Sequence, residues 1–353
     1  MAKIELKNVR HSYDGENWVL GPLNCEFKKG GRYALLGPSG CGKTTLLKIL
    51  SGLITPLEGD LFFDGKKVTK LNPQGRNIAQ VFQFPVVYDT MTVYENLSFP
   101  LRNYGLSQKE TKRRVDEIAR LLELKEALKD KAQGLSPHIK QLVSLGRGLV
   151  RKDVSAVLFD EPLTVVSPQL KTKLRKKLKD IHDELDLTFL YVTHDQTEAL
   201  TFAEEVVVMK EGHILQRGTP KELFDRPASA FVGHFIGTPG MNFLTFEKNN
   251  GRVSPIELAS FVNLQKIKNE NGRGLLGIRP QHIKLTLDPC LERDWVWKVQ
   301  KVEMLGPNNL VVINQGSFSL KVSLSSEKKM RPGDRVGVEF LKDKVNLFNE
   351  DKW

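Results

Sequence analysis

The chain has 353 residues and a formal net charge of +11, with 40% hydrophobic and 27% charged residues. This composition is that of a globular protein, and the length predicts about two or three domains. No apolar run approaches the roughly 20 residues that span a bilayer, and the alternating, charged start MAKIELKNVRHSYDG does not have the pattern of a signal peptide. Cys25, Cys41 and Cys290 are few and widely spaced, which indicates a reducing compartment without disulfides or a cysteine metal cluster.

The first 235 residues alternate short apolar strands with helical patterns, which predicts an α/β fold. The strands are nearly continuous apolar runs, as in a sheet that is buried on both faces. They are RYALLG (32–37), NIAQVF (77–82), SAVLFD (155–160), TFLYV (188–192) and EVVVMK (205–210). Among the helices, one is predicted to begin with the capping box Ser107–Glu110 and to bury Val115, Ile118 and Leu122.

The positive charge is densest in KTKLRKKLKD, at residues 171–180. A basic surface suits nucleic acid or an anionic membrane. However, Leu174, Leu178 and Ile181 recur here at helical spacing, which predicts an amphipathic helix whose lysines face solvent. We therefore expect no nucleic acid partner.

From about residue 236 onwards the pattern changes to turn-rich segments and short alternating strands. In SFSLKVSL (317–324), the residues Phe318, Leu320, Val322 and Leu324 share one face at period two. Several such strands separated by turns predict a small β barrel or sandwich. We expect a domain boundary near 236–242, with one domain at 1–236 and a second at 242–353.

A glycine-rich segment, GPSGCGKTT, matches the pattern G-x-x-x-x-G-K-[ST] between a predicted strand and a predicted helix. Glycines let successive backbone N–H groups point at phosphate oxygens, and the N-terminus of the helix adds positive potential. Lys43 can reach the β and γ phosphates, and Thr44 can offer its hydroxyl to Mg²⁺. The predicted phosphate site consists of Gly37, Pro38, Ser39, Gly40, Cys41, Gly42, Lys43, Thr44 and Thr45.

Polar residues also follow three other predicted strands. In AVLFDEP, Asp160 can hold Mg²⁺ through water while Glu161 polarises the attacking water. His194, in YVTHD, can donate to a γ-phosphate or hold that water, although a histidine in a loop is more often structural. Gln83 ends the strand in AQVFQFP and is uninformative alone.

Taken in order, these motifs resemble those of the ATP-binding subunits of ABC transporters. GPSGCGKTT is similar to their Walker A motif, AVLFDEP to Walker B, and TFLYVTHD to the segment with the switch histidine. Gln83 falls where the family has its Q-loop glutamine. Tyr13, in VRHSYDG, falls where an aromatic residue stacks on adenine, although an aromatic residue at a strand edge is common without such a role.

The resemblance spans nearly the whole chain and points to one branch of the family. THDQTEAL, FIGTPGMNF and GIRPQHI are similar to the carbohydrate importers, the maltose and glycerol-phosphate importer ATPases with a C-terminal regulatory β domain. VYDTMTVYENLSFPL and KQLVSLGRGLVR look most like ATPases of bacterial glycerol importers. The implied fold is a P-loop NTPase cassette with a helical subdomain at about 86–150, followed by a small OB-like domain.

The resemblance also implies a mechanism and a set of partners. Two ATPase chains enclose two ATP molecules with Mg²⁺, and closure pulls on two integral membrane permease subunits that dock at Phe84–Met91. A solute-binding protein acts indirectly, and the chain sits peripherally on the cytoplasmic face of the bacterial inner membrane. The implied catalytic residues are Glu161, His194 and Gln83, and the implied metal-side residues are Thr44, Gln83 and Asp160.

One family motif is altered. The signature LSGGQ stands at the start of a helix, where this chain has Leu135 and Ser136 followed by Pro137, His138 and Ile139. Ser136 can cap the helix and face the partner's ATP, and Pro137 suits the first turn. However, proline removes one N–H, and the two larger side chains crowd an approach that glycine leaves open.

The next loop departs as well, with Ser167 where the family usually has an aspartate that contacts the facing chain. The motifs for this chain's own ATP are intact, and only what it offers to a partner's ATP is changed. We therefore expect a heterodimer with a second, non-identical ATPase chain. The alternative is a homodimer in which Ser136, helped by His138, suffices.

Two rival classes are disfavoured. A non-transport ABC ATPase usually has tandem cassettes or a long coiled coil, whereas this chain has one P-loop and no long heptad run. A small-molecule kinase or GTPase would not need Gln83, His194 and a signature-like helix together, and no N-K-x-D motif is present. The sequence thus predicts an ATP-hydrolysing importer subunit for a small carbohydrate or polyol of the glycerol or glycerol phosphate class.

Overall fold

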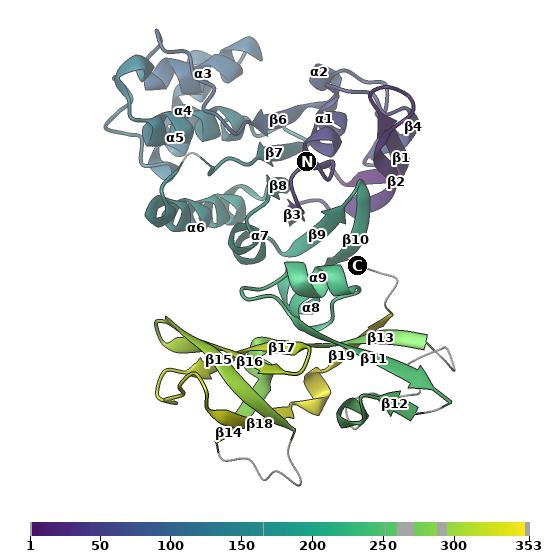
Figure 1. The fold of residues 1–353 in the computed structure, drawn as a ribbon. Coiled ribbons are helices and arrows are strands. Elements are labelled where there is room, and N and C mark those ends of the chain that lie inside the picture. Colours follow the sequence, from purple (N-terminus) through teal and green to yellow (C-terminus); the bar gives the residue numbers. More distant parts are fainter. Residues whose placement is uncertain (1, 165, 251, 260–271, 288–294, 350–353) are drawn as a thin grey trace. The chain divides into compact units, whose positions relative to one another are not determined.

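The computed structural model describes the chain except at residues 1, 165, 251, 260–271, 288–294 and 350–353, so Cys290 lies outside the described residues (Figure 1). It divides into two compact units, Met1–Pro220 and Lys221–Trp353. This division lies earlier than the expected boundary at 236–242, because residues 221–236 pack with the strands that follow them. The predicted domain limits, 1–236 and 242–353, stay a prediction. No described helix is long and apolar enough to cross a membrane.

The first unit contains two sheets. Its strands are β1 (Ile4–Ser12), β2 (Trp18–Phe27), β3 (Arg32–Leu36), β4 (Glu58–Phe63), β5 (Lys66–Lys67), β6 (Ile78–Val81), β7 (Ala156–Asp160), β8 (Phe189–Thr193), β9 (Glu205–Lys210) and β10 (His213–Gly218). One sheet has the order β2-β1-β4-β5 and is antiparallel. The other has the order β10-β9-β3-β8-β7-β6 and is parallel except for β10, which pairs antiparallel with β9. The five predicted strands are confirmed as β3, β6, β7, β8 and β9.

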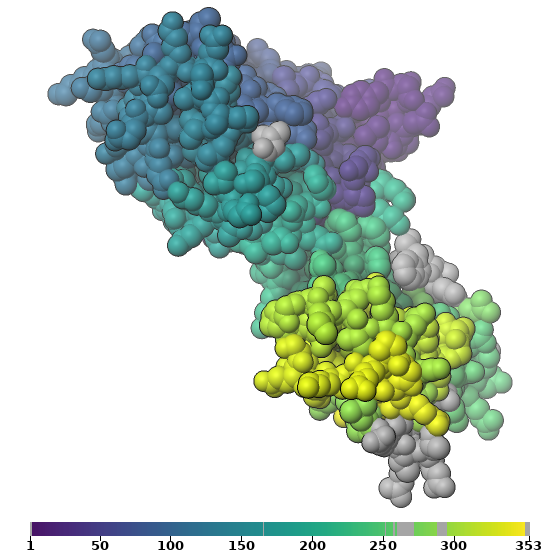
Figure 2. All heavy atoms as spheres, turned by 60° about the vertical axis from the view of Figure 1, so that its left-hand side comes forward, coloured from purple at the N-terminus to yellow at the C-terminus, as the bar shows by residue number. Residues whose placement is uncertain are grey.

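The first unit also contains helices on its sheets and a separate group of helices at one end. They are α1 (Lys43–Ser51), α2 (Pro73–Arg76), α3 (Val93–Asn103), α4 (Gln108–Leu121), α5 (Pro137–Leu149), α6 (Pro168–Leu185) and α7 (Gln196–Phe202). Helix α1 shares one buried cluster with side chains of both sheets, and α7 packs on β3 and β8. Helices α3, α4 and α5 pack on one another and gather at one end of the unit, away from the N-terminal strands (Figures 1 and 2). They form the helical subdomain.

Two helices show why the local sequence folds as predicted. In α4, the Ser107 side chain accepts a hydrogen bond from the Glu110 N–H while the Glu110 carboxylate accepts from the Ser107 N–H, as the capping box requires. In α6, the apolar stripe is buried, and Lys173 and Lys177 both form ion pairs with Glu123. The basic run is thus partly neutralised within the chain.

The second unit begins with α8 (Pro220–Asp225) and α9 (Ala230–Phe235) and continues with strands and short 3-10 turns. The strands are β11 (Asn242–Asn249), β12 (Arg252–Ser254), β13 (Gly272–Ile278), β14 (Ile283–Leu287), β15 (Val296–Leu305), β16 (Asn308–Gln315), β17 (Phe318–Ser325), β18 (Arg335–Phe340) and β19 (Asn346–Asn349). Two antiparallel sheets, β12-β11-β13-β19 and β14-β18-β15-β16-β17, enclose one apolar core. In β17, Leu320, Val322 and Leu324 are buried and alternate with polar residues, so the predicted β domain is confirmed.

A buried arginine ties the two short helices to the β sheets of the same unit. Arg279 is 1% exposed, and its guanidinium donates hydrogen bonds to the backbone carbonyls of Phe224, Gly233 and Ile236. These carbonyls come from α8 and from the region of α9, whereas Arg279 directly follows β13. This contact explains why the unit begins near residue 221.

Candidate active site

Three neighbouring parallel strands bring the predicted site residues to one edge of the large sheet. Strand β8 lies between β3 and β7, and the register pairs Leu36 with Thr193 and Asp160 with Val192. Because the strands are parallel, the segments that follow them leave from the same edge, which is where open α/β sheets bind ligands. The glycine-rich loop, the carboxylate pair and His194 therefore meet there.

The glycine-rich loop at 37–42 needs glycine for reasons that the structure makes explicit. A Cβ atom on Gly37 would lie 2.3 Å from the carbonyl oxygen of Met209. Gly42 has a φ of +97°, and a Cβ there would lie 2.5 Å from a Leu20 methyl group. Larger residues would thus force the loop away from this path. Gly42 precedes α1 without a side-chain cap, which leaves N–H groups of the first helical turn for an anion.

Lys43 is held inside this loop. Its ammonium donates to the carbonyl oxygens of Gly37 and Pro38, both at 2.8 Å, and lies 3.7 Å from the Cys41 sulfur. The side chain is buried, with 6% of its surface exposed. A cation is therefore already positioned at the centre of the loop that would bind phosphates.

Asp160 and Thr44 provide an oxygen pair beside the loop. Burial raises the pKa of Asp160 above its usual value, and the neighbouring Glu161 raises it further, whereas Lys48, Lys43 and the hydrogen-bonding Thr44 hydroxyl oppose the rise. A hydroxyl and a carboxylate within hydrogen-bonding reach fit Mg²⁺, which binds few protein oxygens and keeps waters and phosphates as its other ligands. Within the described part of the chain, no group of three or more His, Cys, Asp or Glu residues suggests another metal site.

Glu161 and His194 are in direct contact. The His194 Nδ1 atom lies 3.0 Å from the Glu161 Oε1 atom. Glu161 has a φ of +46°, uncommon for a residue with a side chain, and its N–H donates to the Val192 carbonyl of the neighbouring strand. Such strained positions cluster at functional sites. Gln83 is half-buried just past β6, and its side chain makes no hydrogen bond to another described residue.

An exposed aromatic ring borders the glycine-rich loop. Tyr13 is 61% exposed, and its hydroxyl lies 3.2 Å from the Thr45 hydroxyl on α1. Its accessible face can stack a base. The structure adds His11, whose ring lies edge-on to Tyr13 at a centroid distance of 4.9 Å. Sequence reasoning missed this buried histidine, although its alternation with Val9 on β1 indicates an inward side chain.

The altered signature forms the helix start that was predicted. The Ser136 side chain accepts a hydrogen bond from the Ile139 N–H, and Pro137 occupies the first position of α5. The Ser136 hydroxyl proton stays available to a phosphate. Burial, together with Lys173 and Lys177, lowers the pKa of His138, which disfavours the protonated imidazole expected to assist Ser136 in a homodimer.

A second missed residue links α5 to the carboxylate pair. Gln141 is fully buried, and its Nε2 atom donates to the Pro162 carbonyl at 2.6 Å. Pro162 directly follows Glu161, so the helix that Ser136 caps is bonded to the segment that carries Glu161. The helical spacing of Gln141 and Leu145 places both on one face of α5, which could have indicated that the Gln141 side chain is buried.

Comparisons with known proteins agree with this geometry. The family model for ABC transporters matches residues 20–164, and the TOBE domain model matches residues 276–348. The sn-glycerol-3-phosphate import ATP-binding protein UgpC of Escherichia coli K12 is 38% identical and is aligned over 99% of this chain and 98% of its own. UgpC of Cupriavidus metallidurans is 37% identical, with coverages of 99% and 97%.

Solved structures match about two thirds of the chain. The cbiO1 structure from Clostridium perfringens, part of an ABC transporter complex, is 28% identical with a TM-score of 0.59 and covers 64% of this chain and 91% of its own. An ATP-binding cassette of an ABC transporter in its ADP conformation is 26% identical with a TM-score of 0.56, at coverages of 64% and 96%. This chain therefore belongs to the ATP-binding subunits of ABC transporters, as an ATPase with a C-terminal all-β TOBE domain.

Proposed function

We propose that this chain hydrolyses ATP to power the import of glycerol 3-phosphate or a closely related small polyol. The hydrolytic part is supported by one observation above all, the contact between Glu161 and His194 at the sheet edge that also carries Lys43. The solute class is supported by the relatives, which are named as glycerol-3-phosphate import proteins and align with this chain over almost their whole length.

The residues divide the work as follows. Tyr13 stacks the adenine, and the backbone of residues 37–45 with Lys43 binds the phosphates. Thr44 and Asp160, with Gln83, would hold Mg²⁺, which neutralises phosphate charge when bound. Glu161 takes a proton from the attacking water, and His194 orients the Glu161 carboxylate through their hydrogen bond.

A preformed surface at Phe84–Met91 supports docking of a permease subunit. Phe84, Val86 and Tyr88 are exposed apolar residues in this segment. Its backbone is held by the helical subdomain: the Arg147 guanidinium donates to the Val86 carbonyl, and the Asn96 amide bonds both backbone groups of Tyr88. A rigid apolar loop needs little ordering when a partner binds. Through the permeases, the chain would sit on the cytoplasmic face of the cell membrane and respond to a solute-binding protein.

We also propose that the second ATPase chain is non-identical. Pro137 offers no N–H to a partner's ATP, and the pKa of His138 is lowered, so the contribution of this chain to the facing site is weakened. A homodimer that relies on the Ser136 hydroxyl is the alternative.

Affinity purification of the chain from its native membrane tests both proposals. We expect two integral subunits and a second ATPase chain to co-purify, and glycerol 3-phosphate with its binding protein to stimulate ATP turnover in reconstituted vesicles. Maltose serves as the control solute. Recovery of the chain without membrane subunits would refute the transport function. A fully active complex with this ATPase chain alone would refute the heterodimer.

A further inference from the structure

We propose that Glu198, a buried carboxylate on α7, is a positioning residue that sets the place of His194 relative to Glu161. Glu198 is 2% exposed, and its hydrogen bonds reach the residues on both sides of His194. The inference rests on the proposed function, because it concerns how the contact by which His194 orients Glu161 is held in place.

Both oxygens of the Glu198 carboxylate accept hydrogen bonds. The Oε2 atom accepts from the hydroxyls of Tyr191 and Thr193, each at 3.0 Å. The Oε1 atom accepts from the ammonium of Lys171 on α6, also at 3.0 Å. Burial raises the pKa of Tyr191 well above its usual value, and the charge of Glu198 raises it further, so the phenol keeps the proton that it donates. The carboxylate is therefore fixed by three donors, two on β8 and one on α6.

These bonds fix the chain on either side of His194. The Thr193 hydroxyl donates to Glu198 and accepts a hydrogen bond from the Asp195 N–H at 3.0 Å. The Asp195 carboxylate, as the N-cap of α7, accepts from the Glu198 N–H at 3.1 Å. His194 thus lies between two residues that are both bonded to Glu198.

The His194 side chain depends on this support. It is 54% exposed, and its Nδ1 atom lies 3.0 Å from the Glu161 Oε1 atom. An imidazole that faces water reaches one fixed partner only if its backbone is held at the right place. Because a displacement of about 1 Å at a catalytic group can cost about 100-fold in rate, the bonds to Glu198 control how well His194 orients Glu161.

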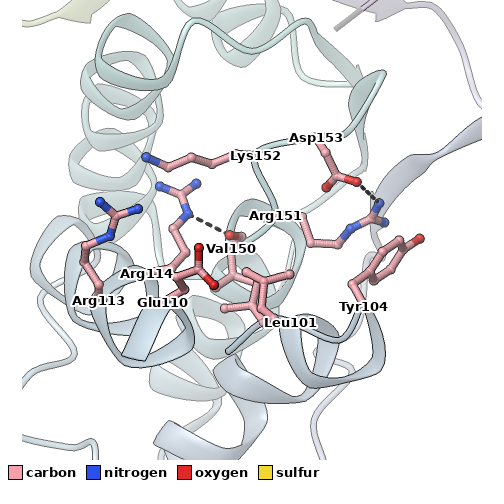
Figure 3. A pocket seen from close by; sticks show the side chains of 10 residues that line it. Leu101, Tyr104, Glu110, Arg113, Arg114, Val150, Arg151, Lys152 and Asp153 are labelled. Carbon is pink, nitrogen blue, oxygen red and sulfur yellow. Dashed lines mark hydrogen bonds and ion pairs between the residues drawn. The ribbon is translucent and has the colours of Figure 1, made fainter. Parts of the chain in front are cut away.

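The buried charge of Glu198 sets it apart from the exposed ion pairs of the same unit. Beside a pocket of the helical subdomain, for example, Arg151 pairs with Asp153, whose side chain is 60% exposed (Figure 3). A buried ion pair such as that of Glu198 with Lys171 adds little to stability, because the loss of hydration offsets the attraction. A fully bonded buried network does, however, hold its members in one geometry. The effect of Glu198 therefore falls on the geometry of residues 193–195.

A double-mutant cycle with His194 tests the inference, with ATP turnover of the assembled complex measured under single-turnover and steady-state conditions. Glu198→Gln keeps the size of the side chain but removes its charge and one acceptor oxygen. We expect it to lower kcat by roughly tenfold or more and to change the KM for ATP by less than about twofold. In a His194→Ala background, Glu198→Gln should cause no further loss, because the residue acts through His194.

The matched control is Glu205→Gln. Glu205 is also a partly buried glutamate in an ion pair, with Arg217, but it lies on β9. This variant should keep wild-type turnover, which shows that the loss of a paired carboxylate is not harmful by itself.

Lys171 gives a second test at a partly exposed position, so the inference stays testable if Glu198→Gln does not fold. Lys171→Met removes the charge that binds the Glu198 Oε1 atom and should lower kcat by roughly threefold or more, again only when His194 is present. Lys171→Arg keeps the charge and should retain nearly wild-type turnover.

The contrary outcomes separate the inference from the proposed function. If Glu198→Gln leaves kcat unchanged, or lowers it by the same factor with and without His194, the inference is wrong and the proposed function stands. The same holds for Lys171→Met if the glutamate variant is unfolded. If His194→Ala itself turns over ATP at the wild-type rate, the proposed role of His194 fails, and the inference fails with it.

Discussion

Glu161→Gln should abolish most ATP turnover while leaving nucleotide binding intact. The amide is nearly isosteric with the carboxylate, so it can keep the contact with His194, which spans 3.0 Å. It cannot take a proton from water, and general-base catalysis typically contributes about 10²- to 10⁴-fold. The barrier should therefore rise by about 2.7–5.4 kcal/mol. Since Glu161 raises the pKa of Asp160, its neutralisation should favour the ionised form of Asp160 and preserve nucleotide binding.

The assay is steady-state phosphate release by the assembled complex, with nucleotide affinity measured separately on the isolated chain. Glu211→Gln is the matched control, because Glu211 also has a positive φ, of +48°, but lies at an exposed turn between β9 and β10. It should keep wild-type turnover. A Glu161→Gln complex with more than about a tenth of the wild-type rate would refute the general-base assignment, since a loss below tenfold is smaller than such catalysis supplies.

Four further changes test the site and its support. Lys43→Ala should weaken ATP binding itself, measured by equilibrium titration, because it removes the buried cation of the glycine-rich loop. Lys43→Ala also silences this chain's own ATP site, which leaves the site that holds the partner's ATP to be measured. In that background, Pro137→Gly with His138→Gly should raise ATP turnover about ten- to a hundredfold, because it restores one charge-assisted bond to the partner's ATP. Unchanged turnover would contradict this expectation. Burial lowers the pKa of His11 below 6.5, so the folded state favours the neutral imidazole. The free energy of unfolding should therefore fall as pH decreases below about 6.5, because the unfolded chain takes up the proton more readily. His11→Phe should reduce that fall, measured by urea titrations at pH 7 and 5.5. Arg279→Ala should destabilise the second unit by about 3–5 kcal/mol in urea unfolding, because three buried carbonyls lose a charged donor.

Local signals carried the sequence predictions that the structure confirms. The five parallel strands were predicted because continuous apolar runs are visible in a short window, and the helix starts at Ser107 and Ser136 because capping depends on neighbouring residues. The bond between Gln141 and Pro162 was not predictable, because it joins residues that only the packing of α5 brings together. The early start of the second unit depends in the same way on Arg279, which reaches back across more than forty residues.

The register of the three central strands also limits how the length of this chain can change over evolution. Leu36, Asp160 and the Val192–Thr193 pair stand at one level of β3, β7 and β8. One residue inserted within a strand would advance its end by about 3.3 Å and turn every later side chain to the opposite face. Such a shift would break the contact between Glu161 and His194, whose atoms are only 3.0 Å apart. Insertions and deletions should therefore be tolerated in the connecting segments but not within these strands, a pattern that a one-residue insertion scan would reveal.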